Sequence, residues 1–164
     1  MEKVYKFIDK ITPQNYLIKL ILISILCVII SILCNVLISY FFELEIINNS
    51  KTITIIKKIK IIHFLIIVII GPLTETFLFQ WLPVYFFKEF KESKKTDFKF
   101  VLLFSLAFGL LHSYSAGYQI SGFVIGFIYL TLTMYYADKK QNFYFPIVVI
   151  HVFNNLIAFI TSNR

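Results

Sequence analysis

The chain has 164 residues, of which 59% are apolar and 15% are charged, and its mean hydropathy is +0.80. Soluble domains are roughly 45–50% apolar and about 25% charged, so this composition excludes an ordinary soluble domain, and it excludes disorder even more strongly. The net charge of +7 comes mostly from lysines in short blocks between apolar runs, without the interleaved aromatic residues of a nucleic-acid site. We therefore expect a single membrane domain over 1–164 that does not bind nucleic acid.

The first two apolar runs are long enough to span a bilayer. Leu20–Phe42 contains 23 residues without a charge, and about 20 helical residues cross a hydrocarbon core of about 30 Å. The second run, Ile61–Phe87, contains one charged side chain, Glu75. Pro72 and Pro83 lie inside this run, and we expect them to kink the helix or to break its ends.

The third apolar run, Phe100–Ala137, has 38 residues without Asp, Glu, Lys or Arg. It would be about 57 Å long as one helix, so the chain must turn within it. The polar stretch at 113–119 is the expected turn, which leaves a short span near 100–115 and another near 119–136. A last uncharged run covers Gln141–Asn163. These runs predict an all-α polytopic membrane helix bundle with about five transmembrane helices.

Basic residues are unevenly distributed between the two sides of the membrane. The three segments expected on one side, 1–19, 88–99 and 137–142, hold 11 Lys and Arg residues, and the segments on the other side hold 5. Because the richer side faces the cytoplasm, we expect the N-terminus to be cytoplasmic and the C-terminus to lie outside. The composition, rich in Ile, Lys, Asn and Phe, is typical of AT-rich bacterial genomes, so we expect an integral protein of a bacterial inner or plasma membrane.

Three ionisable side chains stand out inside the predicted spans, namely Glu75, His112 and His151, whereas His63 lies near the start of its span, where we expect an interfacial structural role. Ionisable residues are costly in lipid, so those inside a span indicate a function. Glu75 and His112 lie about 18 Å from the cytoplasmic ends of their spans. On the last helix, His151 and Asn155 lie about 12 and about 18 Å deep and share one face, because they are four residues apart. Any one of them could simply bond two packed helices together, but the shared depth on three helices favours a common site.

A carboxylate, two imidazoles and an amide at one depth are suited to hydrolysis. Glu75 beside a histidine can hold and deprotonate a water molecule, and a second histidine and Asn155 can donate hydrogen bonds to an oxyanion. Alternatively, Glu75, His112 and His151 can bind a divalent metal, usually zinc, with a water in the open position. The H-E-x-x-H spacing of helical metalloproteases is absent from the sequence, so the metal alternative depends on tertiary convergence.

Three short motifs resemble those of a known family. Pro72–Gln80 (PLTETFLFQ) resembles P-x-x-E-E-x-x-F-R, Phe108–His112 (FGLLH) matches F-x-x-x-H, and His151–Asn155 (HVFNN) matches H-x-x-x-N/D. These are the motifs of the CPBP intramembrane proteases, also called Abi or CAAX-protease-like proteins. The motifs occur in the family's order, and the resemblance covers about 61–160. Residues 1–60 would then form an N-terminal segment with the first transmembrane helix.

The resemblance implies an intramembrane endopeptidase that works in the lipid bilayer on membrane-associated peptides or proteins, either prenylated CAAX proteins or bacteriocin-type substrates. It implies that Glu75 activates water with His112 as its partner. His151 and Asn155 would complete the site or stabilise the oxyanion, with Phe108 in support. The resemblance leaves open whether zinc or another divalent metal is held by Glu75, His112 and His151 or whether no metal is used.

Two residues of the first motif depart from the family pattern. Thr76 stands in place of the second Glu, and Gln80 stands in place of the Arg. Because Thr76 and Gln80 are four residues apart, we expect a neutral hydrogen bond between them instead of an ion pair. The change leaves Glu75 as the one carboxylate within the spans, which removes a second carboxylate ligand for a metal.

Other functions fit parts of the same pattern. A catalytically silent membrane protein on the same scaffold would act in bacteriocin immunity or as an interaction factor. A proton or ion pathway would need a continuous polar stripe, which the spans lack. A serine intramembrane protease would use Ser121 and His151, but its G-x-S-G elbow is missing. We interpret Ser121 as a packing residue beside a G-x-x-x-G motif, Gly122 and Gly126, that permits close helix approach.

Overall fold

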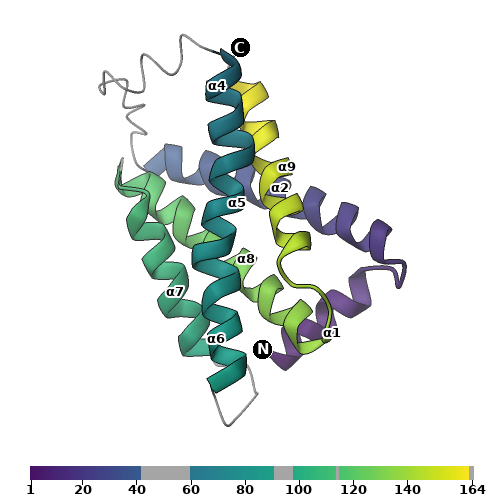
Figure 1. The fold of residues 1–164 in the computed structure, drawn as a ribbon. Coiled ribbons are helices and arrows are strands. Elements are labelled where there is room, and N and C mark those ends of the chain that lie inside the picture. Colours follow the sequence, from purple (N-terminus) through teal and green to yellow (C-terminus); the bar gives the residue numbers. More distant parts are fainter. Residues whose placement is uncertain (42–59, 91–97, 114, 163–164) are drawn as a thin grey trace.

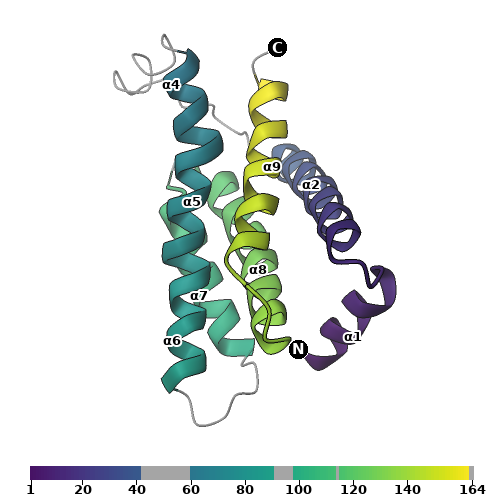
Figure 2. The same ribbon diagram turned by 45° about the vertical axis from the view of Figure 1, so that its right-hand side comes forward.

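The computed structural model describes residues 1–41, 60–90, 98–113 and 115–162, and every regular element within these ranges is a helix (Figure 1). This confirms the predicted all-α bundle. The N-terminus and the end of the last helix lie at opposite ends of the bundle (Figures 1 and 2). The predicted ends of the first span at Phe42 and of the last span at Asn163 lie outside the described residues.

Two N-terminal helices precede the remainder of the bundle. Helix α1 (Glu2–Ile11) is a short amphipathic helix that the hydropathy pattern did not reveal. Helix α2 (Tyr16–Phe41) begins four residues before the predicted span, because Asn15 caps it. The Asn15 Oδ1 atom accepts hydrogen bonds from the backbone N–H groups of Leu17 and Ile18, at 3.0 and 3.1 Å.

The second apolar run forms one continuous helical rod (Figure 1). Each of its two π-helical segments ends two residues before a proline. In an α-helix the proline ring clashes with the carbonyl group of residue i−4, and the wider i→i−5 register moves that carbonyl away from the ring. Neither Pro72 nor Pro83 therefore breaks the rod, contrary to expectation. In chain order the rod comprises α4 (Lys60–Phe64), η1 (Leu65–Ile70), α5 (Gly71–Glu75), η2 (Thr76–Trp81) and α6 (Leu82–Phe90).

The third apolar run turns in the predicted polar stretch. Helix α7 (Phe98–Leu111) precedes the turn, and helix α8 (Ala116–Asp138) follows it. Ser115 caps α8, because its Oγ atom accepts a hydrogen bond from the Tyr118 N–H at 3.1 Å. Since α7 ends before the predicted boundary near 115, His112 lies just after a helix instead of inside a span.

Helix α9 (Phe145–Ser162) ends the described chain and begins four residues later than predicted. Asn142 lies just before it, and its Oδ1 atom accepts hydrogen bonds from the N–H groups of Tyr144 and Phe145, each at 3.0 Å. Helix α9 packs against α2 on one side and against η1 and α5 on the other. Figure 2 shows it between these elements. This position brings the third motif next to the first.

Helix α8 is the centre of the bundle and contacts α2, α6, α7 and α9. Its approach to α7 is close: a Cβ atom added to Gly126 would lie 2.6 Å from the Phe108 ring, and one added to Gly109 would lie 2.7 Å from an α8 carbonyl oxygen. Gly126 and Gly122 thus permit the approach that the G-x-x-x-G spacing predicts. Ser121 packs at the opposite contact, where its hydroxyl donates to Asn35 Oδ1 of α2 at 2.8 Å.

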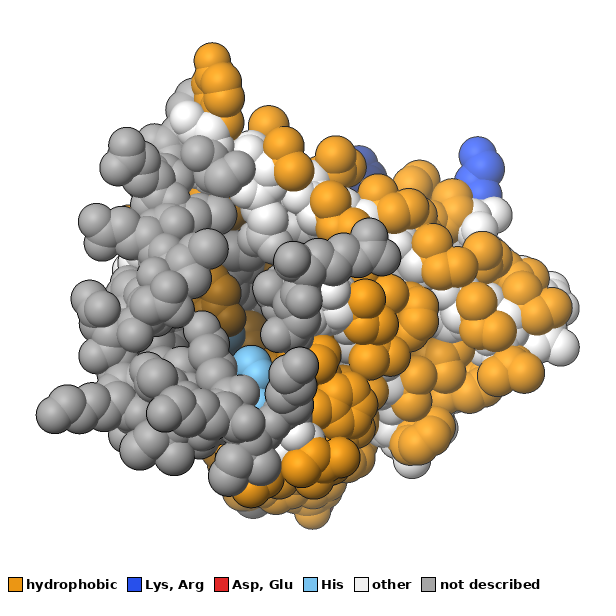
Figure 3. Space-filling model, turned by 90° about the horizontal axis from the view of Figure 1, so that it is seen from above, with side chains coloured by type: hydrophobic (Ala, Val, Ile, Leu, Met, Phe, Trp, Pro, Cys, Tyr) orange, Lys and Arg blue, Asp and Glu red, His pale blue; other side chains and the backbone are white. Residues whose placement is uncertain are grey.

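Three of the described helices are long and apolar enough to cross a membrane, namely Tyr16–Ile38, Ile61–Glu89 and Ala116–Asp138. Helices α7 and α9 are apolar but shorter, so the number of five spans stays a prediction. Seen from above, hydrophobic side chains cover most of the described surface, and basic side chains lie only at its margin (Figure 3). The chain is therefore an integral membrane helix bundle.

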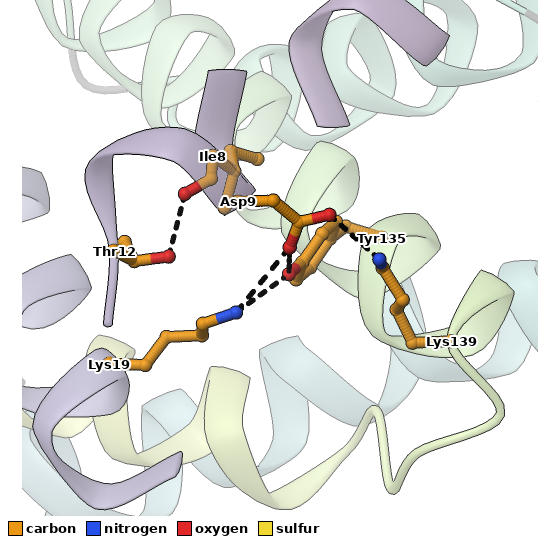
Figure 4. A network of polar contacts seen from close by, with 6 residues as sticks. All are labelled: Ile8, Asp9, Thr12, Lys19, Tyr135 and Lys139. Atoms are coloured by element: carbon orange, nitrogen blue, oxygen red, sulfur yellow. Dashed lines mark hydrogen bonds and ion pairs between the residues drawn. The ribbon is translucent and has the colours of Figure 1, made fainter. Parts of the chain in front are cut away.

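Polar contacts hold α1 against the bundle (Figure 4). Asp9 Oδ2 accepts a hydrogen bond from Lys139 Nζ at 2.7 Å. Asp9 Oδ1 accepts one from the Tyr135 hydroxyl and lies 3.5 Å from Lys19 Nζ. The hydrogen bonds from Lys139 and Tyr135 hold the pKa of the Asp9 carboxyl below its usual value. These contacts join α1 to α2 and to the C-terminal end of α8.

Candidate active site

Glu75 is the last residue of α5, at the junction with the second π-helical segment. Thr76 and Gln80 are buried against the bundle, so Glu75 lies at the edge of the packed face with its side chain 35% exposed. Among the described residues, no side chain or backbone group donates a hydrogen bond to its carboxylate. Glu75 therefore combines partial burial in an apolar rod with free acceptor atoms.

His151 lies beside this carboxylate because α9 packs against η1 and α5. Its side chain is 5% exposed, its Nε2 atom lies 3.6 Å from Glu75 Oε2, and its Nδ1 atom lies 3.3 Å from Thr76 Oγ1. If the Thr76 hydroxyl donates to Nδ1, the ring proton is on Nε2 and faces the carboxylate. The 3.6 Å separation is longer than a hydrogen bond, as is common between catalytic groups before substrate binds.

His112 approaches the same region from the end of α7. Its Nδ1 atom lies 2.8 Å from the Phe108 carbonyl oxygen, which can only accept, so Nδ1 carries the proton. In the neutral ring the Nε2 atom carries no proton and can accept a hydrogen bond. A Cβ atom on Gly122 would lie only 3.0 Å from the imidazole, so the absence of a side chain there makes room for the ring. His112 interacts electrostatically with both Glu75 and His151.

Aromatic side chains frame the two imidazoles. The Phe108 ring centroid lies 4.7 Å from that of His112 and 6.5 Å from that of His151. On the other side of His151, the Tyr129 ring of α8 lies 4.8 Å away and is fully buried. Phe108 thus lies next to both histidines, and its supporting role stays a prediction. Tyr129 was not singled out from the sequence.

The expected hydrogen bond between Thr76 and Gln80 is not formed. The Gln80 Oε1 atom is buried and has no hydrogen-bond partner in the described parts of the chain, and the Thr76 hydroxyl faces His151 instead. The physical reason is that both residues lie in η2, where the i→i+5 register shifts the alignment that an α-helix gives to residues four apart. Thr76 is therefore a direct neighbour of the Glu75–His151 pair.

Asn155 lies one turn beyond His151 on α9, but its amide faces the rod backbone. Asn155 Nδ2 donates a hydrogen bond to the Ile67 carbonyl oxygen at 2.9 Å. The side chains of Glu75, Thr76 and His151 are thus in direct contact, with His112 close by and Asn155 bound to the turn that precedes Glu75.

The side chains of the described residues do not form a three-ligand metal centre. Within the described ranges, no group of three His, Cys, Asp or Glu side chains could hold a metal ion. Glu75 and His151 alone would supply two ligands, and a zinc site ordinarily takes three or four from the protein. The assignment of Glu75, His112 and His151 as metal ligands stays a prediction, and the chemistry proposed below uses the side chains alone.

An open apolar pocket of about 320 Å³ lies along the same rod. Its lining comes from α5, η2 and the segment that leads into α9, namely Leu73, Thr74, Phe77, Leu78 and Tyr144. The Tyr144 hydroxyl donates to the Leu73 carbonyl oxygen at 3.2 Å, which ties that segment to the rod. The pocket therefore lies on the same stretch of the rod as Glu75, although Glu75 does not line it.

The contribution of α8 to the site could have been predicted from the sequence by following one face of this helix. Gly122, Gly126 and Tyr129 recur at intervals of four and three residues, which places them on one side of α8. That side meets His112, Phe108 and His151 in turn. The Gly122–Gly126 spacing predicts close helix packing, and the same face of α8 also shapes the site.

Comparison with protein families gives one match. The model of type II CAAX prenyl endopeptidase Rce1-like proteins matches residues 57–157, which is more than half of the chain and includes all three motifs. No curated protein and no solved structure matches the chain. The match confirms the resemblance drawn from the motifs. The chain belongs to the type II CAAX prenyl endopeptidase Rce1-like family, a family of membrane proteases.

Proposed function

We propose that this protein is an intramembrane endopeptidase that hydrolyses a peptide bond of a membrane-associated substrate with a water molecule activated by Glu75. The observation that carries the proposal is the pairing of a carboxylate that accepts no hydrogen bond from the described residues with a buried imidazole 3.6 Å away. A carboxylate with free acceptor atoms can take a proton from water, and the histidine beside it can orient that water.

The proposed reaction has two proton transfers. Glu75 removes a proton from water as the water oxygen bonds to the scissile carbonyl carbon, which places a negative charge on the carbonyl oxygen. The Nε2–H group of His151 can donate a hydrogen bond to that oxyanion, and the Nε2 atom of His112 can accept a hydrogen bond from the attacking water. Glu75 then returns the proton to the departing amide nitrogen as the C–N bond breaks. Thr76 keeps His151 in the required orientation through its Nδ1 atom.

The proposed substrates are prenylated CAAX-type proteins or bacteriocin-type peptides held in the membrane. The apolar pocket on the same stretch of the rod supports a substrate that carries an apolar segment. We further propose a bacterial plasma membrane with the N-terminus in the cytoplasm, on the basis of composition and of the distribution of basic residues.

Cleavage can be tested with the full chain in proteoliposomes. A farnesylated peptide ending in a CAAX sequence and a bacteriocin-type peptide serve as substrates, with an unprenylated copy of the first peptide as its matched control. We expect cleavage by the wild type and none by Glu75→Gln. A wild type that cleaves no membrane-anchored peptide, while remaining folded, would contradict the proposal.

A catalytically silent protein on the same scaffold is the second candidate. The observation that favours it is the buried Gln80 Oε1 atom without a partner in the described chain, at a position where the family motif has an Arg. The double variant Thr76→Glu/Gln80→Arg restores the two motif residues. Activity that appears only in this variant would favour the silent protein, whereas activity in the wild type excludes it.

A further inference from the structure

The backbone of the first π-helical segment leaves one carbonyl group without its usual partner. The Gly71 N–H donates to the Ile66 carbonyl oxygen, which is an i→i−5 hydrogen bond. In the same register the next donor would be residue 72, and its acceptor would be the Ile67 carbonyl oxygen. Residue 72 is a proline and has no N–H. The Ile67 carbonyl is therefore freed by the sequence itself.

The Asn155 side chain supplies the missing donor. Its Nδ2 atom lies 2.9 Å from Ile67 O. The carbonyl oxygen can only accept a hydrogen bond, so the amide nitrogen of Asn155, and not the amide oxygen, must face it. An unpaired backbone carbonyl is costly inside a membrane, where proline-containing helices depend on neighbouring helices to satisfy such groups. Asn155 thus replaces the hydrogen bond that Pro72 cannot make.

The π-helical turn that Asn155 closes lies close to Glu75 along the rod. The short α-helical segment Gly71–Glu75 follows the turn directly and ends with this carboxylate. A Cβ atom on Gly71 would lie 3.1 Å from Ile66 O and 3.8 Å from Glu75 Oε1, so the turn and the carboxylate are packed together. A change in the register of the turn would rotate Glu75 about the rod axis and away from His151.

We propose that Asn155 is a positioning residue: it closes the π-helical turn opened by Pro72 and thereby fixes Glu75 in register with His151. Asn155 and His151 lie on the same face of α9, so one helix face holds both the turn and the imidazole. The effect on catalysis rests on the proposed function, but the hydrogen bond and its effect on the rod do not.

Rescue by a second substitution separates this role from direct contact with the substrate. Asn155→Ala should lower kcat by about tenfold, because the Ile67 carbonyl loses its partner. Pro72→Ala restores a backbone N–H next to that carbonyl, so the double variant Pro72→Ala/Asn155→Ala should recover most of the loss. If Asn155 acted only by donating to the oxyanion, no change at Pro72 could replace it, and the double variant would be as slow as Asn155→Ala.

Pro83 offers a matched control for the rescue. It follows the second π-helical segment in the same way, since the Leu82 N–H donates to the Phe77 carbonyl oxygen just before it. Pro83→Ala restores an N–H eleven residues away from the turn that Asn155 closes. We expect no recovery in Pro83→Ala/Asn155→Ala. Equal recovery with both prolines would overturn the proposal, because it would reflect general helix stabilisation.

Amide hydrogen exchange in nanodiscs tests the same idea without activity. Asn155→Ala should speed exchange of the amides between Gly71 and Thr76, and Pro72→Ala/Asn155→Ala should return them towards the wild-type rate. Unchanged exchange in Asn155→Ala would overturn the positioning role, whatever happens to cleavage. Faster exchange in a protein that cleaves no substrate would support the positioning role and contradict only the proposed function.

Discussion

Two carboxylates of this protein occupy opposite kinds of surroundings. Asp9, on the N-terminal helix, accepts hydrogen bonds from Lys139 and Tyr135 and lies 3.5 Å from Lys19 Nζ (Figure 4). Glu75, in the membrane-spanning rod, accepts none within the described chain, and the nearest partner is His151 at 3.6 Å. The carboxylate outside the membrane-spanning helices is thus the better paired of the two.

The difference separates structural acids from candidate catalytic ones. A carboxylate whose lone pairs are used by two lysines and a phenol has little left for a reacting molecule, whereas an under-paired carboxylate beside an imidazole can take a proton from water. A carboxylate inside lipid is energetically costly, so its presence there indicates a function. The comparison therefore predicts that changes at Glu75 affect chemistry and changes at Asp9 affect stability.

The largest effect is expected from Glu75→Gln. Loss of the proton acceptor should lower the rate of cleavage by about 10³-fold, while the neutral amide keeps the size of the side chain. The fold should persist, because no hydrogen bond in the described chain depends on the carboxylate. The measurement is reporter cleavage in proteoliposomes together with thermal unfolding in detergent. Asp9→Asn is the matched control, and loss of cleavage in that variant would break the comparison.

A smaller loss is expected from His112→Ala. His112 touches neither Glu75 nor His151 through a hydrogen bond, so it orients the attacking water through its Nε2 atom without taking the proton, and we expect a decrease of about 10²-fold. Gly122→Ala should act in the same direction but more weakly, since the added methyl group would press on the imidazole. Initial rates at saturating substrate measure both. Full activity in His112→Ala would remove this residue from the mechanism.

The sequence was sufficient to predict a helix bundle and a shared depth for the motif residues. Length and hydropathy define the runs, and Gly122 and Gly126 indicate a close helix approach, for which the structure supplies α7 as the partner. The boundaries were less predictable, because they depend on single caps. Asn15 starts α2 early, and Ser115 starts α8 inside the polar stretch. The early end of α7 is what places His112 outside a helix.

The register of the rod could not be predicted from periodicity. The i→i−5 turns exist because prolines stand inside a helix that neighbouring helices keep continuous, and that support comes from residues such as Asn155, 88 positions from Ile67. The same register takes Thr76 away from Gln80 and towards His151. Motif spacing interpreted as an ideal α-helix therefore predicts the wrong partner for Thr76.

Asp9→Asn should cost stability rather than activity. Its loss weakens the charged contacts between α1 and Lys139, and at pH 7 we expect the free energy of unfolding to fall by about 1 kcal/mol. The folded-state pKa of Asp9 is lowered, so its contribution is fully present above the unfolded pKa of about 4 and is lost as the pH falls through the folded value. The difference from wild type should therefore shrink towards pH 3, as measured by unfolding in detergent micelles.

Lys10→Gln provides the control for this measurement. Lys10 lies on the same helix and makes no contact with the Asp9 network, so its loss should leave the unfolding free energy unchanged at both pH values. A difference between Asp9→Asn and wild type that persisted at pH 3 would show that Asp9 acts through packing and not through its charge.

The smallest effect is expected from metal chelation. If Glu75 takes the proton from water directly, cleavage needs no third ligand, and the described side chains provide no three-ligand cluster. Incubation of the purified protein with a chelator should leave the rate of reporter cleavage unchanged, with a zinc peptidase acting on a soluble peptide as the positive control. Loss of activity that added zinc restores would mean that His112 moves to join Glu75 and His151 around a metal. In that case the under-paired state of Glu75 would reflect a missing ligand, and its contrast with Asp9 would have a different cause.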